Sequence, residues 1–79
     1  MNPAQCRAAR ALLDITQSDL AQRADLGLST VVDFEKERRQ VSDEAVRAIR
    51  IALERSGIAF SKEGRFGEGV FLQKRRHPG

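Results

Sequence analysis

Basic side chains lie close together at one point of this chain, in a pattern that suits binding to a polyanion. Lys36, Arg38 and Arg39 fall within four residues of one another, directly after a short apolar segment. Their ammonium and guanidinium groups bind phosphate oxygens through charge-assisted hydrogen bonds. The sequence therefore predicts a phosphate-binding surface.

The sequence offers few residues suited to metal binding, nucleotide binding or acid–base catalysis. His77 and Cys6 are the one histidine and the one cysteine, too few for a zinc site. The segment GRFGEG at 64–69 has many glycines, but it lacks the order G-x-G-x-x-G and no helical pattern follows it. No carboxylates stand in the pattern of a paired acid–base site. We therefore expect no catalytic residues, no metal and no cofactor.

Length and composition indicate one small domain. The 79 residues are 41% hydrophobic, enough for a single core, and the net charge is +3. Tyr and Trp are absent, which disfavours binding of single strands by base stacking. No apolar run is long enough to span a membrane, and MNPAQCRAAR has no apolar stretch of the signal-peptide kind. With its lone Cys6, the chain is expected to be cytoplasmic.

Apolar periodicity predicts the helices, and small polar residues predict where they begin. The expected helices cover residues 3–13, 17–24, 28–36 and 43–56. Asn2, Thr16 and Ser42 are suitable N-caps, and Asp19 can complete a capping box with Thr16. Gly57 suits the end of the last helix.

After Gly57 the periodicity changes to alternation, which predicts two short strands. An isolated two-stranded ribbon is only marginally stable, and this one is too apolar to stand exposed. Some of its side chains should pack on the last helix and the rest on a partner. We therefore divide the chain into a domain at 1–57, a hairpin for dimerisation at 58–73 and a flexible basic tail at 74–79. The candidate dimer interface consists of Ile58, Phe60, Val70, Phe71 and Leu72.

The two central helices have the residue pattern of a helix-turn-helix. Ala21 is small where the helices should cross, Val31 is the apolar residue that it would meet, and Leu26 fills the turn. With Arg10, Gln17 and other residues between Arg7 and about Leu53, this pattern resembles the Cro/cI-like (XRE family) transcription factors. The resemblance implies a mainly α fold, a four-helix lambda-repressor-like domain, here followed by a short C-terminal β-hairpin.

The resemblance also implies roles for individual residues. Base edges would face Leu28, Ser29, Val32 and Asp33. Phosphates would be bound by Thr16, Gln17, Lys36, Arg38 and Arg39. An internal ion pair would join Arg10 to Glu35, although Arg10 can also approach a phosphate. Because the base-facing set holds no Arg, Gln or Asn, we expect modest base readout, supported by DNA shape and backbone contacts.

Departures from the family pattern concern the turns. Asp14, Asp25 and Glu37 stand at or near positions where the family usually has glycine. A left-handed conformation would cost roughly 1 kcal/mol at each. Either the chain accepts that strain, or the turns adopt another geometry.

These observations predict a sequence-specific regulator of transcription. We expect a homodimeric repressor that binds an inverted repeat in double-stranded DNA, with half-sites about one helical turn apart. Autoregulation is common in the family, and control by a regulatory protein stays open, as does activation in place of repression. The alternatives are an antitoxin-type module with secondary DNA binding and a nonspecific nucleoid or RNA binder. We do not expect an enzyme.

Overall fold

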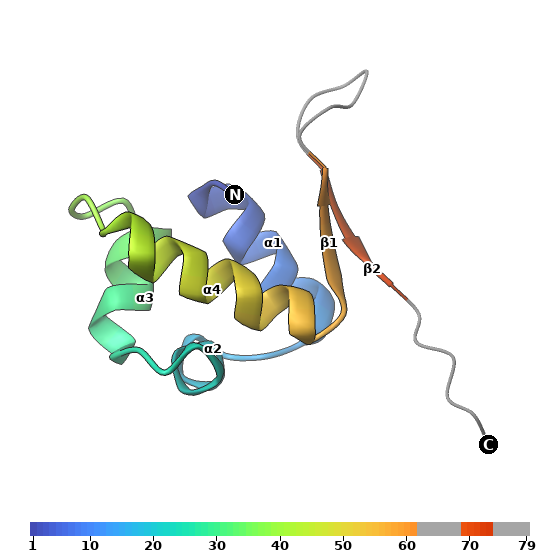
Figure 1. Ribbon diagram of the computed structural model, residues 1–79, viewed down its shortest axis with the longest axis horizontal. Helices are drawn as coiled ribbons and strands as arrows, with labels where there is room; N and C mark the ends of the chain where they lie inside the picture. Colours follow the sequence, from blue (N-terminus) through green and yellow to red (C-terminus); the bar gives the residue numbers. More distant parts are fainter. Residues whose placement is uncertain (62–68, 74–79) are drawn as a thin grey trace.

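Residues 1–61 and 69–73 are described by the computed structural model, and in these residues the fold comprises four helices and a two-stranded sheet (Figure 1). The elements are α1 (Pro3–Leu13), α2 (Gln17–Ala24), α3 (Leu28–Glu35), α4 (Asp43–Arg55), β1 (Ile58–Ser61) and β2 (Gly69–Leu72). The predicted fold class is thus confirmed. The predicted hairpin tip and basic tail, with His77, lie outside the described residues.

Side chains cap the helices where the sequence predicts. Thr16 Oγ1 accepts a hydrogen bond from the Asp19 N–H at 3.0 Å, and the Asp19 carboxylate accepts one from the Thr16 N–H at 3.1 Å. Asn2 and Gln5 form the equivalent box at α1, with both bonds at 2.8 Å. Ser42 Oγ accepts from the backbone N–H three residues on, at 3.2 Å. These caps pair N–H groups that helix starts leave free, so local sequence sets the starts of α1, α2 and α4.

The turns keep the left-handed geometry even though they lack glycine. Asp14, Asp25 and Glu37 have φ values of 55°, 56° and 55°, and Gly57 has a φ of 111°. The sequence left open whether these turns are strained or adopt another geometry. The structure has the strained, left-handed turns. Helices α3 and α4 each end one residue earlier than predicted.

The core lies where the helices cross, and it contains most of the predicted inward residues. Ala21 and Val31 are both buried, and a small side chain at 21 suits the packing of α2 against α3. The burial of Gln5, Val41 and Ala45 was not predicted from the sequence. Gln5 is polar, but its Nε2 donates a hydrogen bond to the Gly69 carbonyl at 3.2 Å. That bond fastens β2 to α1.

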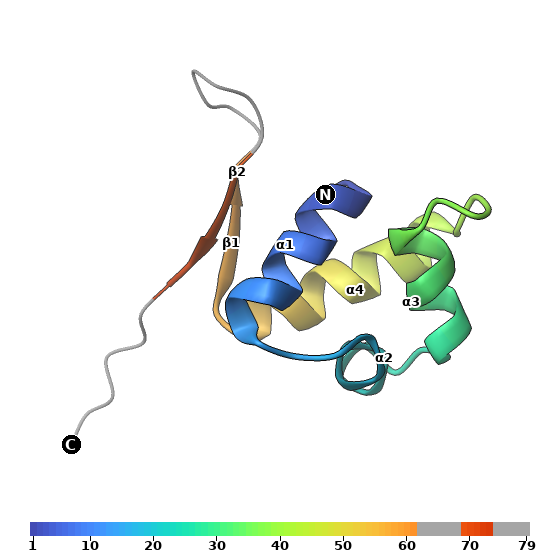
Figure 2. The same ribbon diagram turned by 180° about the vertical axis from the view of Figure 1, so that it is seen from behind.

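The hairpin packs on the side of α1 and α4 that lies away from α3, as both views show (Figure 1 and Figure 2). Its antiparallel register pairs Ile58 with Leu72 and Phe60 with Val70. Ile58 is only 2% exposed and belongs to the core of this chain. Its prediction as an interface residue was therefore wrong, because the alternation that predicts a strand does not say what covers it.

The remaining apolar residues of the hairpin divide into two groups. Phe60 and Val70 are partly buried against the core, and the Arg50 guanidinium lies 5.5 Å from the centre of the Phe60 ring. Phe71 and Leu72 are 58% and 46% exposed. The end of β2 thus exposes two apolar side chains.

Among the described residues, the structure contains no helix with the length and apolar character needed to cross a membrane.

Candidate nucleic-acid interface

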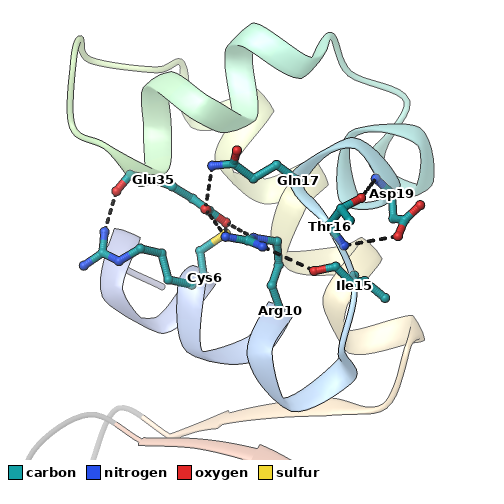
Figure 3. Close-up of polar contacts among 8 residues, drawn as sticks. Cys6, Arg10, Ile15, Thr16, Gln17, Asp19 and Glu35 are labelled. Atoms are coloured by element: carbon teal, nitrogen blue, oxygen red, sulfur yellow. Dashed lines mark hydrogen bonds and ion pairs between the residues drawn. The ribbon is translucent and has the colours of Figure 1, made fainter.

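The last residue of α3 anchors that helix to the rest of the domain. Glu35 is 1% exposed, and its carboxylate forms the predicted ion pair with Arg10 (Figure 3). The pair is bidentate, with Arg10 Nε at 2.6 Å from Oε2 and Nη2 at 2.7 Å from Oε1. Two parallel N–H···O bonds fix direction as well as distance. The ion pair therefore sets the position of α3 against α1.

Further donors surround the same carboxylate. Cys6 Sγ donates to Oε2 at 3.1 Å, and Gln17 Nε2 donates to Oε1 at 3.0 Å. Arg7 Nη1 donates to the backbone carbonyl of Glu35. Burial favours the neutral acid, but the hydrogen bonds from Arg10, Cys6 and Gln17 outweigh it and hold the pKa of Glu35 below its ordinary value. The carboxylate is therefore ionised at neutral pH.

Cys6 is a structural residue in this network. Its side chain is fully buried, and burial, reinforced by the hydrogen bond to Glu35, raises the pKa of the thiol far above its ordinary value. A buried thiol held in the protonated form is a poor nucleophile. Cys6 is thus a small core residue.

Gln17 is the first residue of α2, and its side-chain amide can donate two hydrogen bonds. One N–H of Nε2 donates to Glu35, and the second N–H of the same nitrogen can donate to another acceptor. In Figure 3 the Gln17 oxygen points away from Glu35. Thr16 is exposed beside it, although its hydroxyl accepts the capping hydrogen bond from the Asp19 N–H. The free N–H groups of the first turn of α2 are accessible to an anion at this point.

The residues predicted to read bases lie on the part of α3 that the core leaves accessible. Leu28 is 48% exposed and Ser29 is also exposed, whereas Val32 and Asp33 are half-buried. Val31 and Phe34 of the same helix are buried in the core. The 3.6-residue period of the helix thus separates a face that packs from a face that is open to a ligand.

The predicted cations follow that face directly. Lys36, Arg38 and Arg39 are all exposed. Arg39 differs from the other two because its Nε forms an ion pair with Asp33 Oδ2 at 2.8 Å. The sequence predicts both residues as DNA contacts, but it gives no sign that they bind one another.

Other contacts of the Glu35 network were not predicted from the sequence. Arg7 and Cys6 both contact Glu35, and Gln5 joins α1 to β2. Residues 5 to 7 are consecutive and so point in different directions around α1. The helical period could identify Cys6 as an inward residue, but no spacing rule could identify its partner 29 residues away.

A comparison with known proteins adds one match. A family model described as helix-turn-helix matches residues 7–58. No curated protein matches the chain. The matched range runs from Arg7, within α1, to the first residue of β1. It includes α2, α3 and the pair of Arg10 with Glu35, whereas Cys6 lies just before it.

Proposed function

The chain belongs to the helix-turn-helix family of XRE-type, DNA-binding transcription regulators, and from that premise we propose that it is a homodimeric repressor of specific operators. In this proposal α3 lies in the major groove, with Leu28, Ser29, Val32 and Asp33 toward the bases. Lys36 and Arg38 bind phosphates beside the groove, and the start of α2 binds a further phosphate. Repression follows if the bound dimer excludes RNA polymerase from a promoter, including that of its own gene.

The observation that carries this proposal is the exposure of one face of α3 next to exposed cations. Leu28 and Ser29 are accessible, and Lys36 and Arg38 follow at the other end of the helix. A helix presented in this way fits the width of the major groove, with positive charge toward the DNA backbone. The ion pair of Glu35 with Arg10 keeps the orientation of α3 fixed before DNA binds.

Support for a homodimer comes from the hairpin and the neighbouring surface of α1. Phe71 and Leu72 are exposed, and an apolar groove of about 640 Å³ lies between α1 and β2. Its lining is Asn2, Ala4, Gln5, Ala8, Ala11, Leu12 and Val70, with no charged side chain. An uncharged groove and exposed apolar strand residues suit contact with the same surfaces of a second copy, because a two-fold interface is self-complementary.

The test is selection of binding sites from duplexes with a randomised centre, at moderate salt. We expect an inverted repeat to be enriched, and the pure protein to shift that duplex at concentrations where scrambled duplexes stay free. Lys36→Ala should weaken binding to all duplexes alike and reduce the salt slope by about 1 unit. Binding without enrichment of any sequence would indicate a nonspecific binder instead.

A further inference from the structure

The accessible face of α3 lacks the Arg, Gln and Asn side chains that usually discriminate bases. In the structure, a side chain of this kind comes from outside the helix. Leu28, Ser29 and Val32 offer little directional hydrogen bonding. Asp33, however, is bound to the guanidinium of Arg39, which lies six residues further along the chain. An arginine from the loop after α3 is therefore held at the face that is presented to DNA.

The turn after α3 explains how Arg39 reaches that position. Glu37 adopts the left-handed conformation, with a φ of 55°. The N–H of Arg38 then donates to the Asp33 carbonyl at 3.0 Å, and the N–H of Glu37 donates to the Phe34 carbonyl at 3.2 Å. Such hydrogen bonds fold the chain back over the end of a helix. Arg39 consequently returns alongside Asp33.

The ion pair of Arg39 with Asp33 leaves the edge of the guanidinium that carries Nη1 and Nη2 available. Asp33 uses Nε of Arg39, and Nη1 and Nη2 have no hydrogen-bond partner among the described residues. The Arg39 side chain is 53% exposed, whereas that of Asp33 is 21% exposed. Asp33 is thus the more buried support, and Arg39 is the more accessible group.

We propose that Arg39, held in place by Asp33, reads a guanine in the major groove of each half-site. This inference rests on the proposed function and names one determinant of its specificity. Two N–H donors on one edge of a guanidinium match O6 and N7 of guanine, the commonest specific contact to a base. Asp33 is a positioning residue: its carboxylate fixes the side chain of Arg39 before binding, so less rotamer freedom is lost in the complex.

This assignment replaces two separate roles with one coupled role. The sequence predicts Arg39 as a phosphate contact and Asp33 as a base-facing residue. A phosphate role needs only positive charge, and it would not need a carboxylate bound to the guanidinium. Pairing also neutralises the charge of Asp33, which would otherwise repel the DNA backbone.

The experiment measures base preference in four variants: Arg39→Ala, Arg39→Lys, Asp33→Asn and Asp33→Ala. The duplex site is first selected with the unaltered protein, and each variant is then titrated against it and against duplexes with single base-pair changes. Arg38→Ala is the matched control, since it removes the same charge from the neighbouring exposed position. Circular dichroism and thermal melting verify that each variant is folded.

We expect Arg39→Ala to lose discrimination for one G·C pair in each half-site, by about 5- to 150-fold. Arg39→Lys should lose less, because an ammonium group can still donate to guanine but lacks the planar fork of the guanidinium. Arg39→Lys keeps the charge, so its affinity for scrambled duplexes should be unchanged. Asp33→Ala should lose part of the same discrimination, and Asp33→Asn less, because an amide oxygen still accepts from Nε. Arg38→Ala should weaken all duplexes alike.

The outcomes separate this inference from the function on which it rests. Full retention of the guanine preference in Arg39→Ala would overturn the inference while leaving a sequence-specific regulator. Uniform weakening in Arg39→Ala, equal to that in Arg38→Ala, would do the same and indicate a phosphate contact. If the unaltered protein enriches no site at all, the proposed function itself fails, and the guanine contact fails with it.

Discussion

At the scale of single residues, Glu35 connects the elements on which DNA binding depends. Its carboxylate accepts hydrogen bonds from Cys6 and Arg10 of α1 and from Gln17 of α2. A phosphate that binds the start of α2 would therefore contact a helix whose first residue, Gln17, is hydrogen-bonded to Glu35 at the end of α3. We infer that this network makes α2 and α3 dock on DNA as one rigid unit.

Removal of Arg10 tests the ion pair directly. Arg10→Ala leaves the buried charge of Glu35 without its cation, and we expect the free energy of unfolding to fall by about 3 kcal/mol. Urea denaturation followed by circular dichroism measures it. The control is Glu54→Ala, which breaks the exposed pair of Arg50 and Glu54 and should cost less than about 0.5 kcal/mol. Equal effects in the two variants would mean that burial of Glu35 adds nothing.

The same carboxylate predicts how stability depends on pH. The pKa of Glu35 is lower in the folded chain than in the unfolded chain, so its stabilisation is complete above the unfolded value of about 4.3. Stability should decline as the pH falls through the folded value, because the acid then binds a proton and releases Arg10. Urea titrations between pH 7 and pH 3 measure this decline.

A flatter profile is expected for Glu35→Gln over the same pH range. Asp19 also has a lowered pKa, because its carboxylate accepts the hydrogen bond from the Thr16 N–H. Asp19→Asn therefore separates the contribution of the helix cap from that of the ion pair. An unchanged acid profile in Glu35→Gln would show that other carboxylates cause the decline.

At the scale of elements, the turns carry strain that single substitutions can relieve. Glu37 has a φ of 55°, in the region that glycine adopts most readily. Glu37→Gly should therefore raise the free energy of unfolding by about 0.5–1 kcal/mol. Chemical denaturation is the measurement.

At Gly57 the reverse change can be made, from glycine to a residue with a side chain. Its φ is 111°, and a Cβ there would meet the Gln73 carbonyl oxygen only at an ordinary 3.6 Å. Gly57→Ala should thus destabilise by at least about 1 kcal/mol through backbone conformation alone. A loss of stability in Glu37→Gly would mean that the side chain of Glu37 contributes more than its backbone strain costs.

At the scale of the whole molecule, the arrangement of α3 and the hairpin decides the shape of the proposed dimer. They lie on opposite sides of α1 and α4 (Figure 1 and Figure 2). Two copies joined through their hairpins would place the two α3 helices at the far ends of the assembly. The operator should accordingly have well-separated half-sites, spaced by one helical turn or a whole multiple of it.

Phe71 is the residue that tests this assembly. Phe71→Glu places a charge on a side chain that is 58% exposed, so the monomer should stay folded while the dimer dissociates. Sedimentation of the unaltered protein at tens of micromolar should show a dimer, and the variant should show a monomer. Affinity for the inverted repeat should fall while affinity for a single half-site stays the same. A monomeric unaltered protein, both free and on DNA, would contradict the dimer.

Sequence by itself determined the helices, their caps and the helix-turn-helix, because these depend on residues three or four apart. The hydrogen bonds of Thr16 with Asp19 and of Asn2 with Gln5 are of this kind, and both were predictable from type and spacing. The inward face of each helix follows from the same period. Even the pair of Arg10 with Glu35, which is 25 residues apart, was implied by the family resemblance.

Only the tertiary structure decided which distant side chains meet. Cys6 and Gln17 reach Glu35 because of the angles at which α1, α2 and α3 cross, and no local period contains those angles. The left-handed turn at Glu37 likewise decides that Arg39 binds Asp33. Burial of Ile58 beside exposed Phe71 depends on which face of the hairpin meets the helices. Local hydrogen bonding fixes the elements, whereas packing between them fixes the partners of each side chain.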